Sequence, residues 1–197
     1  MSWFKSASAW AHVAPLSLCL LIGFPALVQG ASGNNAIPVQ YRHSAIAAGV
    51  PYKILYAIAL AESNNPTDKS FSPWPWTLNV AGKPRYFDSK REALAHLKQA
   101  LSTGVRNIDI CVGQINYKYN NHLVPDIDKA LDLEPCLRAA TTVLLRELNY
   151  CEHKLDRLDW WCAVERYHSP GKSGAQRQRA IAYAGRVQRI YTQLNDE

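Results

Sequence analysis

The sequence predicts a mainly α-helical single domain that carries a small β-hairpin. Apolar residues recur at helical spacing in several segments, and prolines and glycines bound those segments. Only residues 67–88 break this pattern, with a stretch rich in proline and tryptophan followed by two short strand-like runs. From residue 31 onward the chain has the length of one domain.

The first thirty residues have the features of a secretory signal peptide. Lys5 provides a positive charge, an apolar run at residues 13–28 follows it, and residues 28–30 offer a cleavage site. The run contains two prolines and is shorter than the roughly 20 residues of a membrane-spanning helix. We therefore expect residues 1–30 to be removed, which leaves an exported domain of residues 31–197 with no stable membrane anchor.

Two helices are expected at the start of this domain. The first covers residues 39–48, with Gly49 suited to its C-terminal cap. The second covers residues 51–63 and ends before Asn64-Asn65-Pro66, because the residue before a proline is pushed out of helical geometry.

The hairpin and a third helix follow. Residues 77–80 and 85–87 are expected to form the two strands of the hairpin, on either side of a turn at Gly82. Ser89-Lys90-Arg91-Glu92 is a capping box that opens a helix reaching Gly104. The expected core face of this helix consists of Ala93, Leu94, Leu97 and Leu101.

Helices also dominate the second half of the chain. Residues 107–116 are expected to form a tight, partly apolar segment, and a short helical stretch follows near His122. Three helices then cover residues 135–150, 159–167 and 175–194. The expected apolar face of the last helix consists of Ile181, Ala184, Val187 and Tyr191.

The cysteines indicate disulfides. Removal of the leader leaves Cys111, Cys136, Cys151 and Cys162, an even number in an exported chain. The chain has no C-x-x-C pair and no H-E-x-x-H run, so we expect no metal site. Paired cysteines also argue against a thiol peptidase, whose nucleophile must be a free thiolate.

Geometry narrows the pairing of these cysteines. Cys136 and Cys151 are fifteen residues apart on one expected helix, hence about 22 Å at 1.5 Å per residue, far beyond the roughly 7 Å between bonded Cα atoms. Of the two remaining arrangements, we predict Cys151 with Cys162, which flank a turn between consecutive helices. Cys111 then pairs with Cys136.

The charge of the chain favours an acidic partner. The full sequence carries a formal charge of +6, which becomes +5 when Lys5 is removed. Basic residues also gather toward the last helix, at Lys172, Arg177, Arg179, Arg186 and Arg189. Charges on a C-terminal helix usually belong to a solvated face, and an exported protein does not meet nucleic acid directly, so we expect no nucleic-acid partner.

Glu62 is the candidate catalytic acid. It continues the face of the second helix that Leu55, Ile58 and Ala59 form. A carboxylic acid held against apolar neighbours has a raised pKa and can donate a proton near neutral pH, as cleavage of a glycosidic bond requires. The alternative is a carboxylate that sits where the helix frays into solvent.

Three segments together resemble the soluble lytic transglycosylase family, whose lysozyme-like fold is related to goose-type lysozyme. Ile54-Leu55-Tyr56-Ala57-Ile58-Ala59-Leu60-Ala61-Glu62-Ser63 resembles the catalytic helix of that family. Val112-Gly113-Gln114-Ile115-Asn116 resembles its Gly-Leu-Met-Gln-(Ile/Val)-Asn segment, and Ala163-Val164-Glu165-Arg166-Tyr167-His168 resembles its Ala-x-x-x-Tyr-Asn motif. The resemblance spans residues 54–168 in the family's order.

The resemblance implies a role for each matched position. Glu62 matches the general acid and base, and Ser63 matches the hydrogen-bonding residue that follows it. Gln114 matches the glutamine that lines the sugar cleft, and Tyr167 matches the tyrosine whose hydroxyl contacts the catalytic carboxylate.

Three positions depart from the family pattern. Gly113 stands where the family usually has methionine, and Cys111 stands where it usually has glycine. His168 replaces the asparagine that follows the tyrosine. These departures leave the catalytic group in place and put the shape of the cleft, and hence the substrate preference, in doubt.

The implied reaction is cleavage of peptidoglycan without a cofactor. Glu62 would protonate the leaving oxygen between N-acetylmuramic acid and N-acetylglucosamine and then take the proton of the C6 hydroxyl of the same muramic acid, giving a 1,6-anhydro end. A hydrolytic muramidase would need a second carboxylate, for which Asp68 and Asp109 are the nearest candidates, both in expected turn-rich loops. A peptidoglycan-binding scaffold without turnover is the other alternative.

Four tryptophans have two interpretations each. Trp74 and Trp76 flank the hairpin, where either can stack on a sugar ring or pack in the core. Trp76 is the candidate for sugar binding. Trp160 and Trp161 are neighbours on one helix and point in different directions, so we expect one of them to pack inside.

The segment Pro75-Trp76-Thr77-Leu78-Asn79-Val80, followed by a helix and the glutamine segment, resembles the specialised transglycosylases of conjugation, type IV secretion and pilus systems. The resemblance implies a periplasmic location and peptidoglycan strands as the partner. It also implies a task beside components of such a machine, for which the wall must be opened locally.

Overall fold

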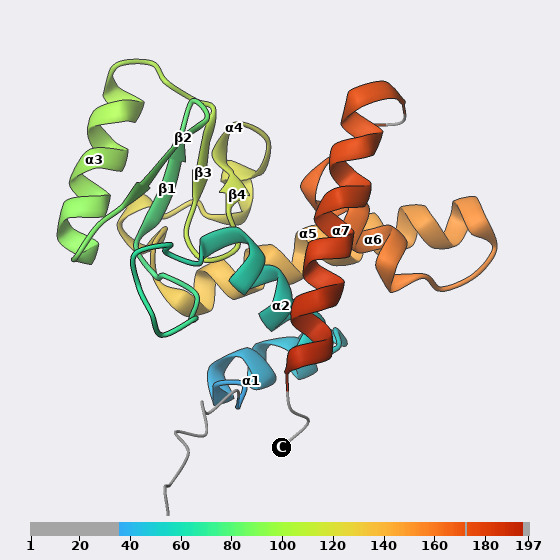
Figure 1. The fold of residues 1–197 in the computed structure, drawn as a ribbon. Coiled ribbons are helices and arrows are strands. Elements are labelled where there is room, and N and C mark those ends of the chain that lie inside the picture. Colours follow the sequence, from blue (N-terminus) through green and yellow to red (C-terminus); the bar gives the residue numbers. More distant parts are fainter. Residues whose placement is uncertain (1–35, 172, 195–197) are drawn as a thin grey trace, which may run out of the picture. The chain divides into compact units, whose positions relative to one another are not determined.

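The computed structural model describes residues 36–171 and 173–194. Within these ranges the chain is mainly helical and carries a four-stranded antiparallel sheet, as Figure 1 shows. The predicted signal peptide, residues 1–30, lies outside the described residues.

The first two helices have the predicted positions. Helix α1 covers Val39–Ala48 and ends at Gly49, whose φ of 72° is the left-handed conformation that glycine adopts at low cost. Helix α2 covers Tyr52–Ser63, and seven consecutive residues from Ile54 to Leu60 are buried. The predicted face of Leu55, Ile58 and Ala59 is buried, and the residues on the other sides of this part of the helix are buried too, because neighbouring elements surround it. Its neighbours include α1 and α7.

The sheet is larger than the predicted hairpin. Strands β1 (Thr77–Val80) and β2 (Lys83–Tyr86) form the hairpin, and β3 (Ile108–Ile110) and β4 (Ile115–Asn116) extend it in the order β2-β1-β3-β4. Residues 107–116, which the sequence predicts only as a tight segment, contain these two additional strands. Such short strands offer too few residues for an alternating pattern to be visible.

Helix α3, Lys90–Ser102, packs against β1. Its predicted cap is present, since the backbone N–H of Glu92 donates to Oγ of Ser89 over 3.3 Å. Short turns then connect β4 to the next long helix, namely α4 (Tyr117–Asn120), η1 (Asn121–Leu123) and η2 (Ile127–Lys129).

Three longer helices complete the fold. Helix α5 covers Leu133–Leu155, α6 covers Trp160–His168 and α7 covers Gly174–Gln193. Helix α7 crosses α2 on the side away from α3 (Figure 1). The buried face of α7 consists of Ala180, Tyr183, Ala184, Val187 and Ile190.

The predicted core face of α7 is confirmed at Ala184 and Val187 and is wrong at Ile181. Ile181 was expected in the core, but it is 43% exposed. Tyr183 occupies the core position instead. One residue corresponds to a turn of about 100° on a helix, which moves a side chain from the core to solvent.

Two disulfides connect elements of the described part of the chain. Cys111 is bonded to Cys136 and Cys151 to Cys162, the two pairs that the sequence predicts. The first bond ties the loop after β3 to the start of α5, and the second joins α5 to α6. Among the described residues, no helix has the length and apolar character needed to cross a membrane.

Candidate functional site

A pocket of about 440 Å³ opens beside the last turn of α2, where Glu62 lies. Its walls come from α2, the sheet, α4, α5, α6 and the loop after α6. The polar and aromatic lining residues are Glu62, Asn79, Asp109, Gln114, Asn116, Tyr119, Asn120, Arg146, Glu147, Arg166, Tyr167 and His168.

Glu62 is an acid poised to donate a proton near neutral pH. Burial raises the pKa of its carboxyl from 4.5 to about 7, because the charged form loses hydration. The charge of Asp109 raises this pKa further, whereas a polar contact with the Tyr183 hydroxyl and the charge of Arg186 lower it. The interpretation of Glu62 as a fraying, solvated carboxylate is therefore not supported.

Tyr183, on α7, is the tyrosine that acts on Glu62, and the sequence interpretation missed it. Its buried hydroxyl makes no hydrogen bond within the described part of the chain, but its polar contact with Glu62 lowers the pKa of the carboxyl. The ring of Tyr183 is held by His168, which stacks on it at 4.5 Å with the planes 9° apart. The spacing of Ala180, Tyr183 and Val187 was the helical pattern that could have revealed its inward position.

Gln114 lies in a constrained loop between β3 and β4. Its Nε2 donates to the carbonyl oxygen of Cys111 over 3.0 Å. Cys111 and Gln114 have φ angles of 61° and 45°, a conformation that costs a non-glycine residue roughly 1–2 kcal/mol. The left-handed conformation explains why glycine suits position 111, and in this chain the bond to Cys136 holds a cysteine there.

Tyr167 lines the pocket, but its hydroxyl has a different partner from the expected one. It donates to the carbonyl oxygen of Gly113 over 2.7 Å, so the expected direct contact with the Glu62 carboxylate is replaced by a bond to the loop. Burial and the nearby charges of Glu62 and Asp109 raise the pKa of Tyr167.

The close approach of Tyr167 also explains Gly113. A Cβ at this position would lie 3.1 Å from the Cβ of Ala140 and 3.2 Å from the Tyr167 hydroxyl. A side chain at this position would therefore require a small shift of Ala140 on α5 or of Tyr167.

Asp109 belongs to the pocket and not to a loop. It lies on β3, where its cross-strand neighbours are Asn79 on β1 and Asn116 on β4. The Nδ2 of Asn116 donates to the Asp109 carboxylate over 2.7 Å. Burial nevertheless raises the pKa of Asp109. The pocket therefore contains another partly buried acid besides Glu62, and its charge raises the pKa of Glu62.

The remaining candidates do not line the pocket. Ser63 is fully buried, and its hydroxyl donates to the carbonyl oxygen of Ala59 over 2.7 Å. Trp76 is half-buried and packs against the core, which favours the structural interpretation of this residue. Asp68 lies in the loop after α2, where Ser70 donates to it and lowers its pKa.

The other tryptophans also have structural partners. The indole N–H of Trp74 donates to the carbonyl oxygen of Phe87 over 2.8 Å. Trp160 and Trp161 are both partly buried against the core, and Trp161 meets the ring of Tyr191 edge-on. None of these three lines the pocket beside Glu62.

A second cavity of about 500 Å³ lies between the end of α5, α6 and α7. Its acids are already paired, Asp159 with Arg157 and Glu165 with Arg177. Because both acids are held by arginines, the smaller pocket with the buried Glu62, whose pKa is raised to about 7, is the better candidate for chemistry. The described part of the chain holds no cluster of three His, Cys, Asp or Glu side chains suited to a metal ion.

Comparison of the chain with protein-family models, with curated proteins and with solved structures found no match in any of the three. Its function is therefore inferred from the pocket and from the motifs at Glu62, Gln114 and Tyr167.

Proposed function

We propose that this chain is a peptidoglycan lytic transglycosylase with a lysozyme-like fold. The observation that carries the proposal is the buried carboxyl group of Glu62, whose pKa of about 7 suits a proton donor, at the wall of a pocket that amide and tyrosine side chains also line. The motif resemblance at residues 54–168 supports the same assignment.

In the proposed reaction, protonated Glu62 gives its proton to the glycosidic oxygen between N-acetylmuramic acid and N-acetylglucosamine. The bond from this oxygen to C1 of the muramic acid breaks, and the N-acetylglucosamine leaves with a free hydroxyl group. The resulting carboxylate then accepts the proton of the C6 hydroxyl of the same muramic acid, whose oxygen bonds to C1. Glu62 recovers its proton and the product carries a 1,6-anhydro end. Tyr183 orients the carboxyl, and Gln114 and Asn116 offer amides to the sugar.

Mass spectrometry of the fragments that the purified domain releases from peptidoglycan tests the reaction directly. We expect anhydro ends from the wild-type domain and no fragments from Glu62→Gln, because the amide neither donates nor accepts the proton. Release of fragments by a folded Glu62→Gln protein would contradict the proposal. Binding without release by the wild-type domain would favour a scaffold protein.

A hydrolytic muramidase is the second candidate, and the position of Asp109 in the pocket favours it. Hydrolysis uses a second carboxylate as nucleophile or to activate water. Asp109 is half-buried on β3, and its charge raises the pKa of Glu62. Reducing muramic acid ends in the same experiment would select this reaction.

The proposed setting is the periplasm. Two disulfides fit a chain that leaves the reducing cytoplasm, and the predicted signal peptide at residues 1–30 fits export. The resemblance of residues 75–80 and the following segments favours a task in local wall opening for a conjugation, secretion or pilus machine.

A further inference from the structure

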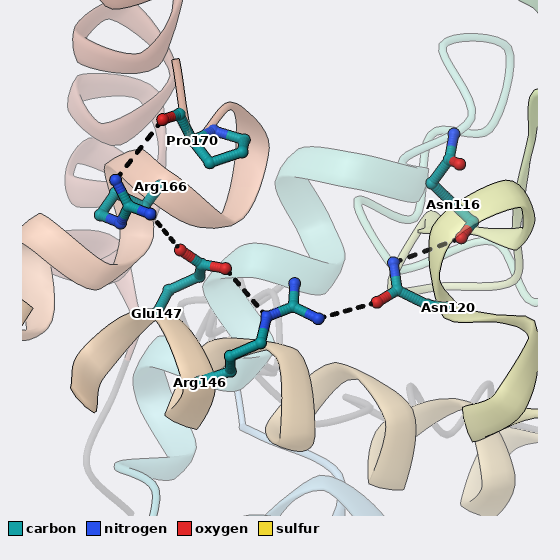
Figure 2. Close-up of polar contacts among 6 residues, drawn as sticks. All are labelled: Asn116, Asn120, Arg146, Glu147, Arg166 and Pro170. Atoms are coloured by element: carbon teal, nitrogen blue, oxygen red, sulfur yellow. Dashed lines mark hydrogen bonds and ion pairs between the residues drawn. The ribbon is translucent and has the colours of Figure 1, made fainter. Parts of the chain in front are cut away.

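One end of the pocket is built around a buried carboxylate shared by two arginines. Glu147, on α5, is only 6% exposed. It accepts a hydrogen bond from Nε of Arg146 over 3.0 Å and forms an ion pair with Nη2 of Arg166 at 2.9 Å (Figure 2). A single carboxylate neutralises one guanidinium, so this end of the pocket retains one positive charge.

Both guanidinium groups are held in place by further contacts. Arg166 lies over the ring of Tyr150 at 3.5 Å and points Nη1 at the carbonyl oxygen of Pro170. Arg146 donates from Nη1 to Oδ1 of Asn120 over 3.0 Å. Asn120 in turn donates to the backbone carbonyl of Asn116 over 3.3 Å, so a continuous chain of contacts crosses the pocket (Figure 2).

Arg146 nevertheless stays open to a ligand. Its side chain is 54% exposed, and its Nη2 makes no hydrogen bond within the part of the chain that the structure describes. Arg146 and Glu62 line the same pocket. A guanidinium that is already oriented loses little freedom on binding, and its planar donors match the two oxygens of a carboxylate.

We propose that Arg146 binds a carboxylate carried by the sugar strand and thereby selects muramic acid-containing glycans over uncharged ones. This inference rests on the proposed function. The rest of the pocket offers amide and hydroxyl groups, such as those of Gln114, Asn116 and Tyr119, which suit the neutral groups of a sugar. N-acetylglucosamine oligomers carry no carboxylate, whereas muramic acid carries one either on its free lactyl group or on an attached peptide.

Titration calorimetry with three ligands tests the inference in a Glu62→Gln background, which prevents turnover. The ligands are an N-acetylglucosamine oligomer, a glycan strand with free lactyl groups and a strand with attached peptides. We expect Arg146→Gln to weaken binding of a carboxylate-bearing strand by roughly tenfold or more, with a much smaller change for the uncharged oligomer. The affected strand identifies the source of the carboxylate. The Arg146→Lys variant should lose less affinity for the carboxylate-bearing strand, because lysine keeps the positive charge.

Arg138→Gln is the matched control. Arg138 lies on the same helix, is similarly exposed and pairs with Glu134, but it does not line the pocket. Equal weakening of all three ligands by Arg146→Gln, or no weakening, would overturn the inference and leave the arginines as a structural network. A domain that cleaves peptidoglycan without this selectivity would retain the proposed function. If Arg146→Gln selectively loses binding of the carboxylate-bearing strands but the wild-type domain releases no fragments, the carboxylate site would stand and the proposed function would not.

Discussion

Glu62 gains its proton-donating character at the expense of stability at higher pH. Its folded pKa of about 7 lies above the ordinary value of 4.5, so the protonated form is favoured by folding. This favourable contribution is complete below about pH 4.5 and is lost as the pH rises through 7. The rise in pKa corresponds to roughly 3 kcal/mol between the two protonation states.

Replacement of Glu62 by glutamine should therefore stabilise the domain under alkaline conditions. An amide cannot ionise, so Glu62→Gln should raise the free energy of unfolding at pH 8 by roughly 1–3 kcal/mol relative to wild type. The difference should shrink toward pH 5, where Glu62 is protonated. Urea denaturation of both proteins at the two pH values measures it. If the difference in unfolding free energy were the same at both pH values, Glu62 would not ionise between them and its raised pKa would be refuted.

Tyr183 should orient and tune the catalytic carboxyl. Tyr183→Phe removes the donor that lowers the pKa of Glu62, so that pKa should rise and the alkaline limb of the activity profile should move to higher pH. If the hydroxyl bonds to the Glu62 carboxylate as the proton is transferred, turnover should fall by roughly 10- to 100-fold, the contribution of a hydrogen bond to a charged group. Turnover measured across the pH range tests both effects.

Tyr191→Phe provides the control for this substitution. Tyr191 lies on the same helix but packs its ring against Trp161, a contact that phenylalanine retains. Its turnover and pH profile should match those of the wild-type domain. A Tyr183→Phe protein with an unshifted alkaline limb would remove Tyr183 from the site.

At the scale of elements, the long helices were predictable because their caps and apolar spacing span many residues. The boundaries moved by a few residues, as for α5, which begins at Leu133 and not at Pro135. Strands β3 and β4 were not predictable, since three and two residues are too few to show alternation. For the same reason Asp109 was interpreted as a loop residue.

The residues of the candidate site likewise differ in whether the sequence reveals them. Glu62, Gln114 and Tyr167 lie in recognisable motifs, and the structure places all three in one pocket. Tyr183 carries no motif in the sequence interpretation and reaches the site only because α7 packs against α2. Ser63 was misplaced because its position at the helix end does not reveal whether its hydroxyl bonds inside the helix.

The two disulfides should differ in their effect on activity more than in their effect on stability. Their sequence separations are 25 and 11, which changes the chain-entropy contribution by less than about 1 kcal/mol. Only Cys111–Cys136 holds the loop with Gln114. Its removal lets the left-handed backbone at Cys111 relax and releases that loop.

Double serine variants separate these contributions. We expect C111S/C136S to lose at least tenfold in kcat/KM, a misplacement effect, while C151S/C162S keeps most of its activity under conditions where both remain folded. Thermal unfolding and turnover of the two variants provide the comparison. Equal losses of activity at equal stability would show that the loop does not depend on its disulfide.

At the scale of the molecule, the site forms where the sheet faces the helices. Glu62 comes from α2, Asp109 from β3 and Tyr183 from α7, segments that are far apart in the sequence. The charge of Asp109 raises the pKa of Glu62, and the polar contact with Tyr183 lowers it. The pKa of Glu62 therefore depends on how both β3 and α7 pack around the end of α2.

This opposition makes Asp109→Asn the substitution that distinguishes the two candidate reactions. Loss of the Asp109 charge should lower the pKa of Glu62 and move the alkaline limb of activity to lower pH, the reverse of the shift in Tyr183→Phe. In a transglycosylase, turnover at lower pH should survive, because Glu62 performs both proton transfers. In a hydrolase that uses Asp109 as its base, turnover should fall by roughly 10²–10⁴-fold at every pH. Asp68→Asn, in the exposed loop after α2, should leave both the rate and the profile unchanged, and a change there would indicate a general effect of charge.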